Sequence, residues 1–364
     1  MEKRSLQAFR VGVLSLLFSL IFNLGSFASS EETKKSFDPG ETIMHHVMDA
    51  HEIHITKGVH IPLPCIVKAK NGFDLFSFSS FKKNESLGYL TYTSGSTGNT
   101  YFYEHGHIYL LDSEKGVMTD ETGSILNEAP YDISITKNVA GMFLGIVIMF
   151  LIFLTVAKSY KTRVGKAPKG IQSLMEPLIL FVRDEIAKPS IGHGYERFMP
   201  FLLTIFFFIW ILNMLGLIPF LGGMNVTGNI GVTMVLALFT FVITSVNAKK
   251  GYWMHIVAPP GVPLWLLPIM VPIEILGVFS KPIVLMLRLF ANITAGHIVL
   301  LSFASLIFIF AEANGPAAGF GVSIVSVAFS VFMNFLELLV AFLQAYVFTL
   351  LSALYFGMAT EEAH

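Results

Sequence analysis

The residues of this sequence that could do chemistry are a few polar and ionisable side chains placed inside long apolar stretches. They are Glu274, Lys281, Arg288, Asn292 and His297 in the stretch from Val262 to Ala311, and Glu337 and Gln344 in the stretch from Pro316 to Thr360. A charged side chain at the centre of a bilayer costs roughly 2.5–3.5 kcal/mol, so it is seldom kept without a function. We therefore interpret these residues as parts of a path for a cation, and we expect that cation to be H⁺.

The spacing of these residues predicts which of them share a helix face. Glu274, Lys281 and Arg288 follow one another at intervals of seven, which places them along one slowly drifting stripe. Asn292 lies four residues after Arg288 and joins its face. His297 lies nine residues after Arg288, a rotation of about 900°, so we expect it on the opposite side.

Arginine and the acid–imidazole pair suit different tasks in such a path. Arg288 cannot lose its proton in a protein, so it is a fixed positive charge that attracts a carboxylate and blocks direct proton leakage. His297 and Glu337 can titrate near neutral pH, and a pair across two helices could relay protons. Gln344 shares the face of Glu337. Because no second carboxylate lies near Arg288 on its helix face, we expect another polypeptide to supply its partner.

Structural roles are the alternatives for the same residues. Arg288 and Glu274 could form a static ion pair, and Lys281 could extend to the membrane interface. His297 could simply pack, and Asn292 and Gln344 could hold helices together. The aromatic run at 206–210 is interpreted as bulk that faces lipid.

The elements that must position these residues are membrane helices. The chain is 54% hydrophobic and only 13% charged, whereas soluble domains carry roughly 25% charged residues. Three apolar runs are long enough to span a bilayer once, and the two stretches named above are each about twice that length. The runs are Asn138–Ala157, Phe198–Leu221 and Met224–Ala248. We predict an all-α polytopic membrane protein with about five transmembrane helices, the last two long and tilted as a hairpin.

The N-terminal part is organised differently. Residues 1–28 have the basic start, apolar run and small residues of a signal peptide, and an uncleaved helix is the alternative. Residues 29–137 are polar and turn-rich, which predicts a small extracytoplasmic module of mixed α/β structure or low order. Residues 138–364 form the membrane domain. The lone Cys65 excludes an intrachain disulfide.

Loop charges predict the orientation. The segment 158–197 and the short loop 248–255 carry lysines and arginines, and the loops near 219–229 and 311–316 carry none. By the positive-inside rule the basic loops are cytoplasmic. The N-terminal module is then outside and the C-terminus inside.

Several motifs resemble one known family, the a subunits of F-type ATP synthases. They are Ser280-Lys281-Pro282, Leu287-Arg288-Leu289-Phe290-Ala291-Asn292, Ala295-Gly296-His297, the run Leu343-Gln344-Ala345-Tyr346-Val347-Phe348, the ending Met358-Ala359-Thr360-Glu361-Glu362-Ala363-His364, and Asn213 with Gly216-Leu217-Ile218-Pro219. The resemblance covers about 138–364 and leaves the N-terminal module aside.

The resemblance implies a division of labour. Arg288 matches the essential arginine that faces the c ring, with Asn292 and Gln344 as polar neighbours. Glu274, His297 and Glu337 match residues that line two aqueous half-channels. Many bacterial members have Glu at the position of His297 and His at that of Glu337, an exchange that keeps one acid and one imidazole.

The resemblance also implies partners and a location. It implies a non-catalytic subunit of the bacterial inner membrane that contacts the c-subunit ring, the peripheral-stalk b subunits, other ATP synthase subunits and the lipid bilayer. A P-loop of the form GxxxxGK[ST] is absent from the sequence, and we expect no cofactor, no metal and no nucleic acid. A histidine cluster at 45–60 leaves a metal site open as an alternative, but its spacing matches no defined zinc motif.

Other classes of function remain as alternatives. A secondary transporter could use Arg288 to bind an anionic substrate, although we find no convincing internal repeat. A membrane scaffold would leave the ionisable residues unexplained. A membrane-bound enzyme would need a nucleophile–base or metal-ligand set, which we do not find.

Overall fold

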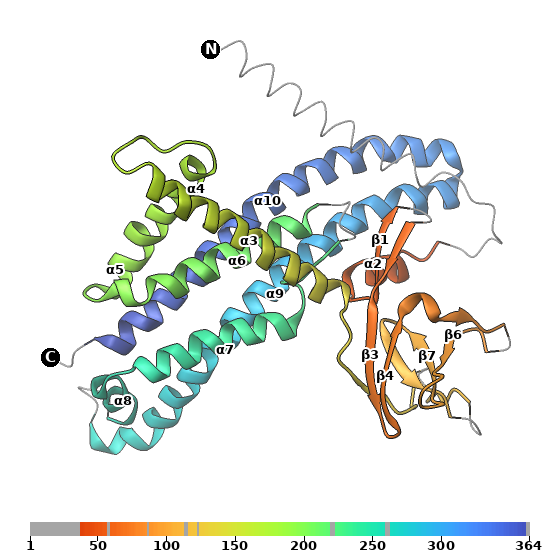
Figure 1. The fold of residues 1–364 in the computed structure, drawn as a ribbon, viewed down its shortest axis with the longest axis horizontal. Helices are drawn as coiled ribbons and strands as arrows, with labels where there is room; N and C mark the ends of the chain where they lie inside the picture. Colours follow the sequence, from red (N-terminus) through yellow and green to blue (C-terminus); the bar gives the residue numbers. More distant parts are fainter. Residues whose placement is uncertain are drawn as a thin grey trace, which may run out of the picture.

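The structure is a computed structural model that describes residues 37–56, 59–85, 87–112, 116–121, 124–218, 223–258 and 263–361. A bundle of long helices occupies most of the chain, and a small β-rich module lies at one end of it (Figure 1). The predicted signal peptide at 1–28 lies outside the described residues.

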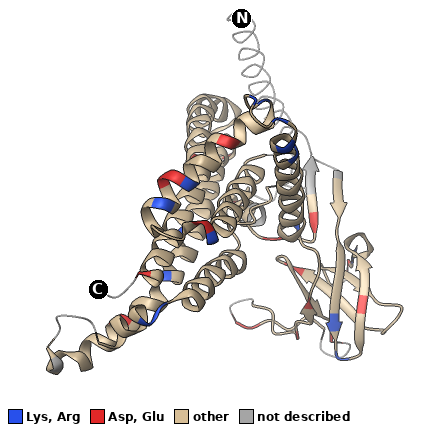
Figure 2. Ribbon diagram, turned by 60° about the vertical axis from the view of Figure 1, so that its left-hand side comes forward, with Lys and Arg blue, Asp and Glu red and all other residues tan. Residues whose placement is uncertain are grey.

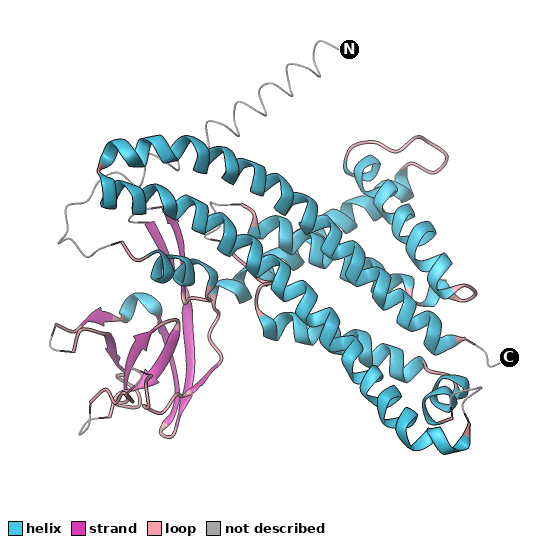
Figure 3. Ribbon diagram, turned by 180° about the vertical axis from the view of Figure 1, so that it is seen from behind, coloured by secondary structure: helices cyan, strands magenta, loops and turns pink. Residues whose placement is uncertain are grey.

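Five helices among the described residues are long and apolar enough to cross a membrane. They are α3 (Lys137–Thr162), α6 (Met199–Gly216), α7 (Ile230–Asn247), α9 (Leu267–Asn314) and α10 (Pro316–Thr360). Charged residues are sparse along these helices, as Figure 2 shows. The prediction of about five spans with a long final pair is confirmed, since α9 and α10 have 48 and 45 residues and lie side by side (Figure 3).

Local signals set the ends of these helices. The Thr136 side chain accepts a hydrogen bond from the backbone N–H of Val139 and caps α3. Gly315 separates α9 from α10 with a φ of 86°, a left-handed conformation that glycine adopts without a steric penalty. The Asn229 side chain caps α7 at Gly231. The third span therefore begins six residues later than the predicted Met224, because 223–229 form a polar loop.

The interpretation of the aromatic run at 206–210 as lipid-facing is wrong. Phe206, Phe207 and Ile209 are fully buried. Phe206 packs edge-on against Phe342 of α10, with 5.8 Å between ring centroids, and Phe207 packs against Phe153 of α3 at 4.9 Å. The helix α6 is thus a central helix, packed between α3 and α10, and its aromatic rings fill the core.

The basic segment between α3 and α6 is not a simple loop. It contains α4 (Ile171–Phe181), a π-helical turn (Val182–Ala187), α5 (Lys188–Ile191) and a 3₁₀ turn (Tyr195–Arg197). The helix α5 lies so close to α10 that a Cβ at Gly357 would collide with the carbonyl oxygen of Ser190. This close contact fixes the segment against the C-terminal end of α10. Two further short helices, α8 (Lys250–Val257) and a 3₁₀ turn (Leu264–Leu266), lead into α9.

The N-terminal module is a packed, β-rich structure with one helix, so of the two predicted alternatives the described residues agree with mixed α/β structure and not with low order. After α2 (Pro39–Val47) come antiparallel sheets of order β1-β2, β4-β3-β9 and β5-β6-β7-β8. Their strands are β1 (Glu52–Thr56), β2 (Val59–Pro62), β3 (Pro64–Ala69), β4 (Gly72–Ser77), β5 (Lys82–Lys83), β6 (Leu90–Thr93), β7 (Thr100–Glu104), β8 (His107–Leu110) and β9 (Tyr131–Asp132), with a 3₁₀ turn at Phe78–Ser80. Aromatic and aliphatic side chains from both larger sheets form one core around Cys65, Phe76 and Tyr101.

Hydrogen bonds join the module to the first turn of α3. The Asp49 carboxylate accepts from the backbone N–H of Asn138 at 3.0 Å and from the Thr136 hydroxyl at 2.7 Å. The backbone N–H of Lys137 donates to the carbonyl of Ala50 at 2.7 Å. The start of α3 is therefore anchored in the module, which satisfies N–H groups that a helix terminus leaves open.

Candidate functional site

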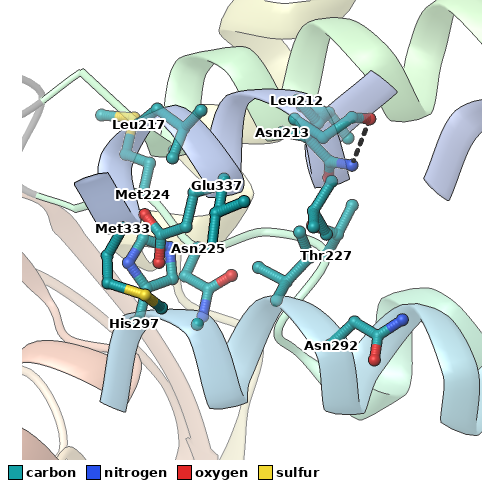
Figure 4. A pocket seen from close by; sticks show the side chains of 16 residues that line it. Leu212, Asn213, Leu217, Met224, Asn225, Thr227, Asn292, His297, Met333 and Glu337 are labelled. Atoms are coloured by element: carbon teal, nitrogen blue, oxygen red, sulfur yellow. Dashed lines mark hydrogen bonds between the residues drawn. The ribbon is translucent and has the colours of Figure 1, made fainter. Parts of the chain in front are cut away.

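A cavity of about 170 Å³ lies among α6, α9, α10 and the loop at 223–229. One water takes about 30 Å³ of liquid, so the cavity has room for several waters. Its polar lining residues are Asn213, Asn225, Thr227, Asn292, His297 and Glu337. Figure 4 shows Glu337 and His297 beside one another, with Asn292 toward the other end of the cavity.

Glu337 is the residue of this cavity with the most demanding environment. It is half-buried, and its Oε1 is fully shielded without a hydrogen-bond partner among the described residues. Gly296 makes room for it, because a Cβ at that position would lie 2.8 Å from Oε1. A buried carboxylate oxygen is normally satisfied by a proton or by an ordered water, and the cavity is large enough for water. The structure thus brings His297 and Glu337 together, as the sequence predicted.

The opposite wall of the cavity is held by a short chain of hydrogen bonds. The Thr227 hydroxyl donates to Asn213 Oδ1 at 2.6 Å, and Asn213 Nδ2 donates to the carbonyl of Ala341 at 3.2 Å. These contacts tie the loop to α6 and α6 to α10. Sequence reasoning missed Asn225 and Thr227, although Asn-Val-Thr-Gly-Asn is a turn signal inside an apolar run.

The N-terminal module reaches this wall through Met224. The Met224 side chain packs in one small cluster with Ile53 and Leu63 of the module and Ala140 of α3, and it also lines the cavity. The module therefore contacts the loop that forms one side of the cavity.

Arg288 lies near the middle of α9 and is exposed on the surface of the single chain. None of the ion pairs found within the described part of the chain involves it. Glu274 lies fourteen residues away on one continuous helix, a rise of about 21 Å. The static pair with Glu274 is thus excluded. Tyr355 of α10 lies close enough to interact electrostatically with Arg288.

Glu274 and Lys281 belong to a second group at the α8 end of α9. The ammonium of Lys281 lies 5.9 Å from the ring centroid of Tyr252 and 5.4 Å from that of Tyr355. Glu274 interacts electrostatically with Lys281 and with Tyr252. Lys281 therefore packs over two rings instead of extending freely, and Arg288 separates this group from the cavity along α9.

Of Asn292 and Gln344, only Asn292 lines the cavity. Asn292 is exposed, as Arg288 is four residues earlier, and it lines the cavity that also contains His297. His297 lies five residues after Asn292, a rotation of about 500°. The side chains of Asn292 and His297 therefore project about 140° apart, on adjoining sides of α9. Gln344 is buried on α10 and is not among the cavity residues, although Glu337 lies only seven positions earlier.

The described part of the histidine cluster in the module does not form a metal centre. Within the described residues, no three His, Cys, Asp or Glu side chains come together in a way that could hold a metal ion. His51 is buried, and its Nε2 lies 3.0 Å from Asp132 Oδ2. Although burial raises the pKa of Asp132, hydrogen bonds from His51 and Ser134 bring it below its usual value. His51, the residue before β1, thus links the start of that strand to β9.

Comparison with known proteins divides the chain into two matched ranges. Residues 139–357 match the family model described as ATP synthase A chain, and residues 42–133 match a domain of unknown function, DUF8433. The chain is 48% identical over 246 residues to ATP synthase subunit a of Chloroherpeton thalassium, covering 64% of this chain and 71% of that protein. It is 45% identical over 240 residues to ATP synthase subunit a of Myxococcus xanthus, covering 64% of this chain and 75% of that protein.

Proposed function

Because this chain belongs to the ATP synthase A chain family, we propose that it moves protons past Arg288 to a ring of c subunits. Family membership makes it a multi-pass, non-catalytic Fo subunit of a bacterial ATP synthase, with a role in proton translocation. The finer assignment concerns which residues carry the proton and where the partner lies.

The observation that carries the proposal is the state of Arg288. It is a permanent cation, exposed on a 48-residue apolar helix, and no described carboxylate of its own chain pairs with it. Keeping such a charge in a membrane needs a counter-ion. A carboxylate that arrives on another polypeptide would meet this need only while it faces Arg288.

Two polar groups on either side of Arg288 support two separate half-channels. The cavity with His297 and Glu337 is the entry side in this proposal, with a proton passing to the c-ring carboxylate. The group around Glu274 is the exit side. Between them the guanidinium attracts the deprotonated carboxylate, and its fixed charge prevents protons from passing directly from one side to the other.

The route of one proton follows from the cost of charge in lipid. A proton taken from Glu337 neutralises the c-ring carboxylate, and the neutral group can then move through hydrocarbon. After most of a rotation of the c ring, the carboxyl group loses its proton on the Glu274 side. Each elementary charge that crosses 100 mV yields about 2.3 kcal/mol, so several protons are needed for one ATP.

The orientation and the other partners are part of the same proposal. The basic segment that contains α4 and α5 would face the cytoplasm, where it could meet the peripheral-stalk b subunits. The N-terminal module would then lie outside, next to the entry cavity that Met224 connects it to.

The direct test is Arg288→Ala in the assembled complex. ATP-driven proton pumping into membrane vesicles should disappear, because the c-ring carboxylate loses its attracting charge, and assembly should be retained. Arg163→Ala, which removes a basic residue just after α3, should pump normally. Normal pumping by Arg288→Ala would refute the central assignment.

A crosslinking experiment separates this proposal from a transporter for an anionic substrate. Leu287→Cys and Ala291→Cys place thiols on exposed positions that flank Arg288. In the complex they should crosslink to a small two-helix proteolipid. A transporter would give no such product.

A further inference from the structure

One face of the N-terminal module exposes large apolar side chains that its fold does not need. In the sheet β4-β3-β9, alternate residues such as Cys65 and Phe76 point into the core. The other face carries residues that are strongly exposed. They are Phe73 (63%), Leu75 (74%), Tyr131 (79%) and Ile133 (62%).

The strand register joins these side chains into one patch, which we call the sheet patch (Ile66, Lys68, Phe73, Leu75, Tyr131 and Ile133). Lys68 of β3 lies opposite both Phe73 of β4 and Tyr131 of β9, and Ile66 lies opposite Leu75. The Lys68 ammonium lies 5.3 Å from the ring centroid of Phe73. Contiguous exposed apolar surface of this kind marks an interaction site.

The chain holds the sheet patch near the end of a membrane span. Ile133 lies four residues before Lys137, the first residue of α3. Four residues reach at most about 14 Å even when fully extended. The hydrogen bonds of Asp49 and Ala50 to the first turn of α3 also keep the module at that end.

The sheet patch also faces in the right direction. Figures 1 and 3 show β3 and β4 on the side of the module nearer the helices, with β6 and β7 on the far side. The core of the module lies between the two larger sheets. The opposite face of β3 and β4, which carries the sheet patch, is therefore turned toward the side on which the spans enter the bilayer.

From these observations we propose that the sheet patch rests on the surface of the lipid bilayer. Its apolar side chains enter the boundary between headgroups and acyl chains, where tyrosine is a favoured residue. The Lys68 ammonium, which lies over the Phe73 ring, is then a cation at the level of the lipid phosphates. The module is thus held by lipid as well as by α3, and this role does not depend on how the cavity moves protons.

The test places a fluorescent reporter on the patch of the full chain in lipid nanodiscs. Leu75→Cys is labelled with an environment-sensitive maleimide dye, in discs of phosphatidylcholine with or without chains brominated near the headgroup. The native thiol does not compete, because Cys65 is fully buried and burial raises its pKa to about 12. The matched control is Lys83→Cys on β5, an exposed position in the other large sheet.

The expected result is blue-shifted emission from the Leu75→Cys dye that brominated lipid quenches several-fold more strongly than the control dye. A second reporter at Tyr131→Cys should respond in the same way. Equal quenching of the patch and control dyes would overturn the proposal. Blue-shifted emission that brominated lipid does not quench would also overturn it, because protein would then cover the patch.

Discussion

The module and the membrane domain each bury a carboxylate, and they treat it in opposite ways. Asp74 of the module is 1% exposed and accepts hydrogen bonds from Ser94 at 2.5 Å, Thr97 at 2.6 Å and Tyr101 at 2.6 Å. Glu337 of the membrane domain has a buried oxygen without a partner within the described residues. Asp74 is thus satisfied by its own chain, whereas the role proposed for Glu337 needs an oxygen that can take up a proton.

Some cations show a similar contrast. Outside the five spans, Lys70 pairs with Glu128 at 2.6 Å, and Arg183 pairs with Asp184 at 2.8 Å. Arg288 has no such pair among the described residues, although the membrane makes its charge far more costly. An unpaired cation inside a span, such as Arg288, is therefore a place where we expect a partner molecule to act.

The largest effect that would test this comparison is expected for Glu337→Gln. The amide keeps the shape of the side chain but cannot exchange a proton, so proton-driven ATP synthesis should fall by about tenfold or more. The complex should assemble normally. ATP synthesis in inverted vesicles under an imposed proton gradient measures the loss.

The control for this variant is Glu312→Gln at the end of α9. Glu312 is exposed and accepts a hydrogen bond from the backbone N–H of Phe37, which an amide oxygen can also accept. The rate of proton-driven ATP synthesis by Glu312→Gln should equal that of the wild type. Equal rates for the two variants would remove Glu337 from the proton path.

A smaller effect is expected for Gly296→Ala. The added methyl would lie 2.8 Å from Glu337 Oε1, so the carboxylate must move within the cavity. Transport should slow by about threefold, roughly 0.7 kcal/mol of barrier, and its dependence on external pH should shift. The control is Gly277→Ala on the same helix, where the added methyl has no neighbouring atom within 4 Å. This variant should change neither the transport rate nor its pH dependence. An unaltered pH profile for Gly296→Ala would show that the position of Glu337 does not limit proton uptake.

Much of the membrane domain could be predicted from sequence because lipid imposes a simple rule. Every backbone group must be paired inside a span, so length and apolarity indicate the helices directly. The same rule makes each intramembrane charge conspicuous, which identified Arg288, His297 and Glu337. What it could not provide was the packing partner of each face. The aromatic ring of Phe206 is as apolar in the core as it would be in lipid, so composition did not distinguish the two.

The module was harder to predict for the opposite reason. Its strands are two to six residues long, and their pairing depends on contacts between distant segments such as β3 and β9. Nothing in the sequence around Asp74 singled it out. Only the fold brings it to the hydroxyl groups of residues 94–101, which are 20 to 27 positions away in the chain.

The smallest effect on transport, and the sharpest contrast with Glu337, is expected for Asp74→Asn. The substitution removes the charge that the hydroxyls of Ser94, Thr97 and Tyr101 share with that of Ser96, which donates to Asp74 at 2.7 Å. Hydrogen bonds to a charged group contribute about 1.5–3 kcal/mol. We expect the module to lose about 2–4 kcal/mol of local stability. Hydrogen exchange of the β4 and β7 amides in the full chain measures this, and proton-driven ATP synthesis should change little.

The pH dependence gives an independent check of the Asp74 prediction. Burial raises the pKa of Asp74, but the hydrogen bonds from Ser94, Thr97 and Tyr101 more than offset this and hold it well below the usual value. The stabilisation is therefore complete above the pKa of about 3.9 in the unfolded chain, and it is lost as the pH falls further toward the folded value.

Exchange protection of the wild-type module should decline in that acid range, and the Asp74→Asn module should lack this part of the decline. The control Glu128→Gln breaks an exposed ion pair worth about 0–1 kcal/mol. Its module should show the same decline in exchange protection at acid pH as the wild-type module. Identical acid profiles for wild type and Asp74→Asn would show that the Asp74 charge does not stabilise the module.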